Sequence, residues 1–396
     1  LHKEYRRQRQ MCIRDSNKIF VMRQTKIIAT FGPSLEDPEV LKKVLERADV
    51  IRFNLAHGTW DKSDSQNNAK KIKLVQKTAK KINKPIATLV DLKGNKIRIG
   101  NFKKHLIELK ASDKIEVRFT DQSMTNKNEI IINADHVFNK IDKKDLILMD
   151  DGLIKLRVEK VTTNNKTLHC QVIEGGLLSS NKGFEVEGKI INKSGLRDED
   201  KEDIKRLAKL SVDWIALSFV NDASDVNQAR EVLSQEDSDI KLIAKIERLK
   251  ALKQLYWIIK ASDGIMVARG DLALESGPGE LTGLQKNIIK QTIKGKKVAI
   301  TATQMMESMI NNPSPTRAEM TDVSNAVLDG SDAVMLSAET AIGKYPAETV
   351  EAMHEVCVGA ESYHQSISKK EEFKYSEVQH IDEAIALSSM LSLIHI

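Results

Sequence analysis

Short apolar segments alternate with amphipathic segments along most of the chain. The apolar segments are rich in branched residues, which is typical of buried parallel strands. We expect eight such strands, at residues 25–30, 50–55, 85–92, 214–219, 242–247, 264–268, 297–301 and 333–336. Amphipathic helices are expected between most of them, at 38–47, 61–81, 198–210, 223–234 and 283–294. This β–α alternation predicts an α/β fold of the closed (β/α)8 barrel type, with an open doubly wound sheet as the alternative.

One stretch of the chain breaks this alternation. Between residues 94 and 182 the pattern changes to short strands separated by turn residues, at 114–120, 129–133, 145–149, 153–161 and 167–173. Such a pattern predicts an all-β domain inserted after the third barrel strand. Because active sites of barrels gather at the carboxyl ends of the strands, we expect the inserted domain to act as a lid over the site. A passive insertion is the alternative, because loops tolerate insertions at little thermodynamic cost.

The last part of the chain predicts a helix, a linker and the beginning of another domain. A helix is expected at 347–362, a polar linker at 366–379 and a further helix at 381–390. We therefore expect the first part of the barrel at 17–93, the lid at 94–182, the second part of the barrel at 183–362, and a linker with the start of a truncated C-terminal α/β domain at 363–390.

One DNA tag, read on opposite strands, would account for both ends of the chain. The codons CTG TCT CTT ATA CAC ATC encode residues 391–396, and their reverse complement, shifted in frame, encodes residues 11–15 and begins the codon for Ser16. Residues 6–10 fit the upstream part of the same tag. We expect 1–16 and 391–396 to be translated adapter DNA rather than native protein.

The composition sets limits on partners and location. The net charge is +6, and residues 1–16 contribute three of these charges, so the rest of the chain carries +3 and predicts no nucleic-acid partner. Cys170 and Cys357 are far apart and lack metal-ligand spacing, a pattern typical of a reducing, cytoplasmic location. No apolar segment reaches membrane-spanning length, so no membrane association is predicted.

Charged residues stand at the ends of two successive predicted strands. Lys245 and Glu247 are two positions apart at the end of one strand and therefore point to the same face. Asp271 follows the next strand. An ammonium group and two carboxylates in an apolar frame form a candidate site, although a buried ion pair without function would explain one pair alone.

Polar residues follow the other predicted strands in the same way. Because the carboxyl ends of parallel strands meet at one end of a barrel, all of these side chains are expected near one site. They are Arg52, Asn54, Asp91, Lys93, Ser218, Thr303, Ser337 and Glu339.

Several long motifs resemble those of the pyruvate kinase family, especially its bacterial members, from about residue 23 to 390. The motifs are TKIIATFGP at 25–33, RFNLAHG at 52–58, DLKGNKIR at 91–98, SNKG at 180–183, AKIE at 244–247, MVARGD at 266–271, TQMMES at 303–308 and DGSDAVMLSAET at 329–340. The resemblance implies Mg²⁺-dependent transfer of a phosphoryl group from phosphoenolpyruvate to ADP, giving pyruvate and ATP in the last step of glycolysis. It also implies a cytoplasmic homotetramer, with Mn²⁺ as an alternative ion.

The resemblance further implies roles for individual residues. Glu247 and Asp271 are expected to bind Mg²⁺, because carboxylate oxygens are ligands that this ion prefers. Lys245 is expected to stabilise the transition state at the phosphoryl group, and Arg52 to contact its oxygens, because a forked guanidinium suits phosphate. The backbone at Gly270 and Asp271 and the hydroxyl of Thr303 are expected to hold the substrate carboxylate. The proton donor to the enolate is left open.

The nucleotide is expected to contact four residues that the family motifs place near the two lid hinges: Asn54, His57, Arg98 and Lys182. A structural hydrogen bond after the second strand is an equally weighted reading of His57.

The sequence departs from the family pattern at its monovalent-cation site. Many members bind K⁺ through oxygens at positions matching Asn54, Ala56, Asp91 and Leu92, with Glu at position 96. Here Ala56 and Leu92 lack the oxygens, and Lys96 supplies an ammonium. Asn54 and Asp91 would be the remnant of that site, and we predict catalysis without added K⁺.

Two other readings remain open at this point. Barrel lyases that handle phosphoenolpyruvate or pyruvate enolates also use a Glu and Asp metal pair, but such a lyase has no use for a lid with a nucleotide-binding lysine. A non-enzymatic fragment with an impaired fold is the third reading, because loss of a C-terminal domain would expose apolar surface. A requirement for ADP would distinguish the pyruvate kinase reading from the lyase reading.

Overall fold

The computed structural model describes residues 23–368 except 62, 65–66, 103–105, 121–123, 126–128, 151, 190–195 and 278. The expected adapter-derived ends, 1–16 and 391–396, lie outside the described residues. So do the helix expected at 381–390 and most of the linker expected before it.

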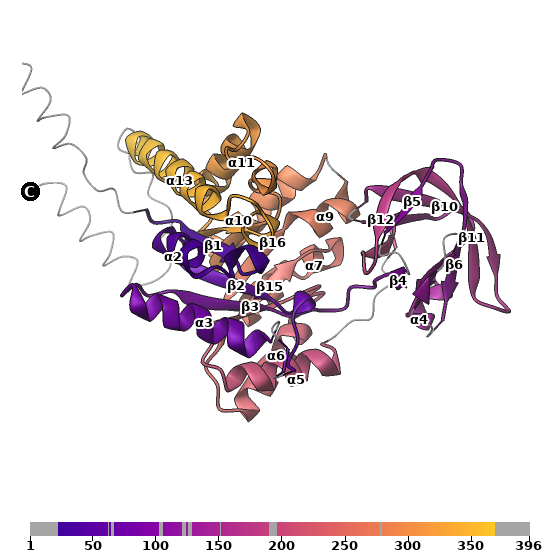
Figure 1. Cartoon of the computed structure of the whole chain (residues 1–396), viewed down its shortest axis with the longest axis horizontal. Helices are drawn as coiled ribbons and strands as arrows, with labels where there is room; N and C mark the ends of the chain where they lie inside the picture. The colour runs from indigo at the N-terminus through magenta and orange to yellow at the C-terminus, as the bar shows by residue number, and fades with distance from the viewer. Residues whose placement is uncertain are drawn as a thin grey trace, which may run out of the picture.

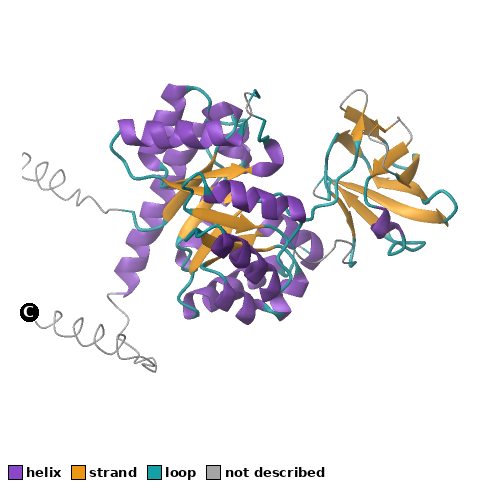
Figure 2. Ribbon diagram, turned by 90° about the horizontal axis from the view of Figure 1, so that it is seen from below, coloured by secondary structure: helices purple, strands orange, loops and turns teal. Residues whose placement is uncertain are grey.

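Eight parallel strands of the described residues close into a barrel, which confirms the predicted fold class. The barrel order is β1, β18, β17, β16, β15, β14, β3 and β2, and β2 closes back on β1. Figure 2 shows these strands surrounded by helices. The strand bounds are β1 Lys26–Thr30, β2 Val50–Asn54, β3 Ala87–Asp91, β14 Trp214–Leu217, β15 Lys241–Ile246, β16 Gly264–Ala268, β17 Val298–Ala302 and β18 Ala333–Leu336.

The helices cover the outside of the barrel. They are α2 Pro38–Arg47, α3 Asn68–Lys81, α5 Asp198–Ala208, α6 Ala223–Gln235, α7 Leu249–Lys253, α8 Leu255–Ala261, α9 Arg269–Ser276, α10 Leu281–Lys294, α11 Arg317–Leu328, α12 Ala338–Ala341 and α13 Pro346–Ser368. The 3₁₀ segments are η1 Pro33–Leu35, η2 Leu55–His57 and η3 Glu307–Ile310. Helix α13 continues beyond residue 362, where the sequence predicted its end, because residues 363–368 contain no Gly or Pro to stop it.

Two hydrophobic cores follow from the two-residue period of the strands. On β15, Leu242 and Ala244 pack outward with the helices, whereas Ile243 packs inward with residues such as Met266 of β16. Inward-facing side chains fill the barrel interior, as in other closed barrels of eight strands. The inward phase that begins at Ile243 carries Lys245 and Glu247 to the interior at the carboxyl end of the strand.

The helix predicted at 61–81 begins only at Asn68. Asn67 is its N-cap, and its side chain accepts a hydrogen bond from the Lys70 amide at 3.0 Å. Before it, the Asp61 carboxylate accepts from the Ser63 amide at 2.9 Å. Such side-chain bonds to nearby backbone compete with helix formation, which explains the shorter helix.

The inserted segment forms a separate β-rich domain, called the lid below, which stands to one side of the barrel (Figure 1). Its main sheet has the order β13, β9, β10, β11, β6 and β8, and two smaller sheets pair β12 with β5 and β4 with β7. The bounds are β4 Asn101–Phe102, β5 Leu106–Leu109, β6 Lys114–Phe119, β7 Met124–Thr125, β8 Glu129–Ile132, β9 Leu146–Met149, β10 Ile154–Thr162, β11 Thr167–Glu174, β12 Gly176–Ser179 and β13 Phe184–Val186, with one short helix, α4 Asp135–Phe138.

The lid has its own hydrophobic core. Phe119 contacts Phe138 and Phe184 edge-on, with ring centroids 5.5 Å and 6.0 Å away. Because β13 pairs with β9, the lid sheet extends past residue 182.

Among the described residues, no helix combines the length and apolar character needed to cross a membrane.

Candidate active site

A cavity of about 150 Å³ opens at the carboxyl ends of the barrel strands, on the side where the lid is attached. Ten of the residues that the sequence predicted for the site line it: Arg52, Asn54, Asp91, Lys93, Arg98, Ser218, Lys245, Glu247, Asp271 and Thr303. These residues come from six different strands or the turns after them, so barrel closure brings them together.

The Lys245 ammonium is buried and held by three groups. Its Nζ lies 3.0 Å from Glu247 Oε1, 2.9 Å from Ser218 Oγ and 3.3 Å from Asp91 Oδ1. Burial alone would lower the pKa of Lys245, but Asp91 and Glu247 outweigh burial and raise it. Lys245 is therefore a permanent cation at neutral pH.

Asp91 joins Lys245 to Arg52 at the floor of the cavity. Arg52 Nη2 and Nε donate to Asp91 Oδ2 at 2.6 Å and 3.0 Å, and Arg52 Nη1 donates to Thr30 Oγ1 at 3.1 Å. Burial raises the pKa of Asp91, but Lys245 and Arg52 together hold it below its usual value. Asp91 thus fixes two cations side by side and stays ionised.

Glu247 is fully buried and is held by a backbone amide as well as by Lys245. The Phe219 N–H donates to Glu247 Oε2 at 2.5 Å, and Phe219 has a left-handed backbone with φ of +58°. Burial raises the pKa of Glu247 and the nearby Asp271 carboxylate raises it further, against the effect of Lys245. The Glu247 and Asp271 carboxylates therefore repel each other, and a bound cation would relieve this repulsion.

Asp271, in the first turn of α9, is paired with a second lysine. Lys96 Nζ lies 2.6 Å from Asp271 Oδ1. Each of the two acidic residues predicted to bind Mg²⁺ thus has its own ammonium partner, Lys245 at Glu247 and Lys96 at Asp271.

Thr303 is held in a strained conformation beside α9. Its φ is +68°, and its Oγ1 accepts a hydrogen bond from the Gly270 amide at 2.9 Å. Glycine at position 270 permits close approach of other groups to the backbone. Within the protein, however, a Cβ at 270 would meet only Thr303 Oγ1, at 3.7 Å, so the fold alone does not require glycine there.

A second cavity, of about 440 Å³, lies next to the first and shares Arg52 and Asn54 with it. His57 lines this second cavity, together with Lys71 and Ser337. Burial and the nearby Arg98 and Arg52 lower the pKa of His57, so its imidazole is neutral at pH 7. Asn54 also has a structural part, because its Oδ1 accepts from the Ala56 amide at 3.0 Å and begins η2.

The two basic residues at the lid hinges differ in their placement. Arg98 lines the first cavity, and its Nη1 donates to the Asn181 carbonyl at 2.8 Å. Lys182 lines neither of the two cavities and instead pairs with Asp150 of the lid, with Nζ 2.6 Å from Oδ1.

Some groups at the site have roles that the sequence did not suggest. Ser218 was expected at a strand end without a role, yet its Oγ contacts both Asp91 and Lys245. The Arg269 side chain donates to the Thr303 carbonyl, a contact that the sequence did not predict. The position of Ser218 at a strand end was a usable signal, whereas the left-handed backbone of Phe219 leaves no trace in its residue type.

Comparisons with known proteins agree with this arrangement. Residues 22–350 match the family model described as pyruvate kinase, barrel domain. A pyruvate kinase of Buchnera aphidicola subsp. Schizaphis graminum is 46% identical over 383 residues, which is 95% of this chain and 77% of the relative. A pyruvate kinase of Haemophilus influenzae is 41% identical, over 94% of this chain and 78% of the relative. Pyruvate kinase II of Salmonella typhimurium is 40% identical, over 95% and 78%. This chain belongs to the pyruvate kinase family.

Proposed function

We propose that the chain transfers a phosphoryl group from phosphoenolpyruvate to ADP, giving pyruvate and ATP, with Mg²⁺ and without a requirement for K⁺. The observation that carries the proposal is the shared cavity in which the Lys245 ammonium stands with Arg52 and two carboxylates. Transfer of a phosphoryl group needs this kind of preorganised charge, because the charge on the moving group must be neutralised as the group is positioned. The names of the relatives support the same reaction.

The donor set suits Mg²⁺ with few protein ligands. Glu247 and Asp271 line one cavity. Burial raises the pKa of Glu247, Lys245 lowers it, and the nearby Asp271 carboxylate raises it. The described residues contain no cluster of three or more His, Cys, Asp or Glu side chains that could hold a metal. Mg²⁺ is commonly bound by one or two carboxylates together with substrate oxygens and water, so two carboxylates are enough. A bound Mg²⁺, or Mn²⁺, would neutralise charge on the phosphoryl group.

The remaining roles follow from where the side chains lie. Lys245 and Arg52 would contact the phosphoryl oxygens, and Asp91 would hold both cations in place. Thr303 and the first turn of α9 at Gly270 would orient the substrate carboxylate. The larger cavity, lined by Asn54 and His57, would receive the nucleotide, with Arg98 at its phosphates; Lys182 would join them only after leaving Asp150.

Independence from K⁺ is supported by the position of Lys96. Its ammonium lines the same cavity as Asn54 and Asp91, the remnant of the family's K⁺ site, and already supplies a monovalent positive charge there. A homotetramer is also part of the proposal, on the family resemblance alone.

The test measures the production of pyruvate from phosphoenolpyruvate. Lactate dehydrogenase, added as a coupling enzyme, reports the pyruvate formed. We expect pyruvate only when both ADP and Mg²⁺ are present, with an equal amount of ATP. Pyruvate formed at the same rate without ADP would contradict the proposal and favour lyase or hydrolytic chemistry. A preparation of Lys245→Met, purified in the same way, controls for contaminating activity.

A further inference from the structure

Lys96 lies between the barrel and the lid and is close to a carboxylate of each. Its Nζ is 2.6 Å from Asp271 Oδ1 in the barrel and 3.8 Å from Glu185 Oε1 on lid strand β13. The Lys96 side chain is only 13% exposed. The two carboxylates therefore face one partly buried ammonium from opposite domains.

The stem of Lys96 is also packed against the lid. A Cβ added at Gly183, at the beginning of the β13 segment, would come within 2.6 Å of Lys96 Cε. Gly183 in turn pairs with Arg98 in an isolated antiparallel bridge at the lid hinge. The position of the lid strand and the position of the Lys96 side chain are thus linked by direct contact.

The two carboxylates do not hold Lys96 equally. At 2.6 Å the contact with Asp271 is a charge-assisted hydrogen bond, whereas 3.8 Å from Glu185 is too long for a hydrogen bond and within range of an ion pair. Lysine has a flexible stem and a compact charge, so a small rotation is enough to exchange one partner for the other.

Under the proposed function, a divalent cation and the Lys96 ammonium compete for the Asp271 carboxylate. A cation bound by Asp271 and an ammonium 2.6 Å from the same carboxylate repel each other strongly at this degree of burial. The repulsion decreases if the Lys96 ammonium turns to the Glu185 carboxylate, which is already its neighbour.

We propose that Glu185 is a positioning residue that takes over the Lys96 ammonium when Asp271 binds a divalent cation, and that this exchange draws the lid toward the barrel. This inference rests on the proposed function, because it assumes that Asp271 is a metal ligand. It couples the filling of the metal site to the position of the lid through side chains of this chain alone.

The first test measures Mn²⁺ binding to the full chain by electron paramagnetic resonance, without substrate or nucleotide. Glu185→Gln should weaken Mn²⁺ binding about two- to fivefold, the range for a partly exposed ion pair. Glu187→Gln removes the same charge from an exposed position two residues further along and should leave binding unchanged. An equal effect of the two substitutions would overturn the inference.

Lys96→Met provides the background that isolates the exchange. Because the ammonium is then absent, adding Glu185→Gln to Lys96→Met should not change Mn²⁺ binding further. If Glu185→Gln weakens binding as much in this background as in the wild type, Glu185 acts on the site directly and the proposed exchange is wrong. If the wild-type chain binds no Mn²⁺, the proposed metal requirement is wrong. If the wild type binds Mn²⁺ and Glu185→Gln binds it equally well, only the exchange proposed here is wrong.

The second test follows the lid itself, with Mg²⁺ as the probe ion. Spin labels at Leu153→Cys on the lid and Tyr256→Cys on the barrel occupy exposed positions, 70% and 56%. Cys170 and Cys357 are buried, and burial raises the pKa of each thiol to about 12, so labels will not attach there; Cys12 is replaced by Ser. Mg²⁺ should shorten the distance between labels in the wild type and in Glu187→Gln but not in Glu185→Gln. Equal shortening in all three would overturn the proposal.

Discussion

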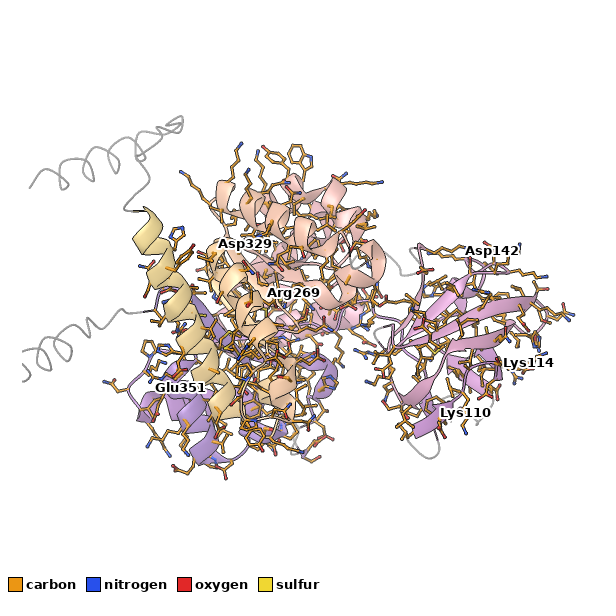
Figure 3. All side chains as sticks on the ribbon, turned by 90° about the horizontal axis from the view of Figure 1, so that it is seen from above. Lys110, Lys114, Asp142, Arg269, Asp329 and Glu351 are labelled. Carbon is orange, nitrogen blue, oxygen red and sulfur yellow. The ribbon has the colours of Figure 1, made fainter. Side chains whose placement is uncertain are left out.

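The Arg269 side chain holds Thr303 by its backbone, with Nη2 2.6 Å from the Thr303 carbonyl oxygen. The same guanidinium donates to the Gln304 carbonyl at 3.0 Å and pairs with Asp322 at 2.7 Å (Arg269 is labelled in Figure 3). Thr303 and Gln304 both have left-handed backbones, with φ of +68° and +53°. Conformations of this kind cost about 1–3 kcal/mol each and persist only where neighbouring contacts enforce them.

We expect Arg269→Lys to lower kcat because a lysine cannot bond both carbonyls and Asp322 in the fixed geometry of a guanidinium. Thr303 would then shift, and a displacement of about 1 Å in a substrate-positioning group can cost about 100-fold in rate. A fall in kcat of about 10- to 100-fold is expected, measured with the coupled assay at saturating ADP. Arg230→Lys is the matched control, because Arg230 pairs with Asp263 away from the cavity. A folded Arg269→Lys variant with the wild-type kcat would show that Thr303 does not depend on this contact.

Lys245→Met removes the ammonium at the centre of the site. Loss of one preorganised donor typically costs about 10²–10³ in kcat, and we expect a loss of at least this size. The substitution also leaves Glu247 and Asp91 with fewer counter-charges in a buried place, so the unfolding midpoint should fall. Circular dichroism at the assay temperature must therefore confirm that the variant is folded. A folded variant with a near-normal rate would refute the role of Lys245.

The central charges of the site could be predicted from the regular geometry of the barrel strands, whereas contacts made by the lid could not. A period of two places Lys245 and Glu247 on one face, and barrel closure brings the strand ends together, so the central charges could be predicted from the sequence. The pairing of Lys96 with Asp271 could not, because it depends on where the lid hinge passes the barrel. The same holds for the short lid strands such as β5 and β13, because their four and three residues are too few to establish a period.

Backbone conformation accounts for most of what the sequence did not reveal at the site. Phe219 aims its amide at Glu247 from a left-handed conformation that aromatic residues rarely adopt, so its residue type predicts the opposite. Thr303 is a similar case, because its strained backbone is held by Arg269 at the start of α9. Contacts between distant parts of the chain, rather than local preference, decide both conformations.

The activity should not depend on K⁺. Lys96 supplies a charge in the cavity beside Asn54 and Asp91, and Ala56 and Leu92 offer no side-chain oxygens there. We expect equal initial rates in KCl and in a tetraalkylammonium chloride at the same ionic strength. A large stimulation by KCl would contradict this prediction, whereas Lys96→Glu should create a dependence on K⁺ if the ammonium replaces the ion.

The stability of the barrel should decrease in mild acid because of His354 on α13. Arg23 Nε donates to His354 Nδ1 at 3.1 Å, so the imidazole is neutral and acts as an acceptor. Burial lowers the pKa of His354, and Arg47 and Arg23 lower it further, with Glu351 and Asp49 opposing them. The folded pKa is therefore below the unfolded value of about 6.5.

The sign of the effect follows from proton binding in the two states. Between the folded and the unfolded pKa the unfolded chain binds more protons, so the contribution of His354 to stability is fully present above about pH 6.5 and is lost as the pH falls through the lower folded pKa. His354→Gln keeps an acceptor for Arg23 but does not titrate. The unfolding midpoint is measured by thermal denaturation in matched buffers. The midpoint of the wild type minus that of His354→Gln should therefore decrease as the pH is lowered from 8 to 5. A difference that stays constant over this range, or rises in acid, would mean that the folded state does not favour the neutral imidazole.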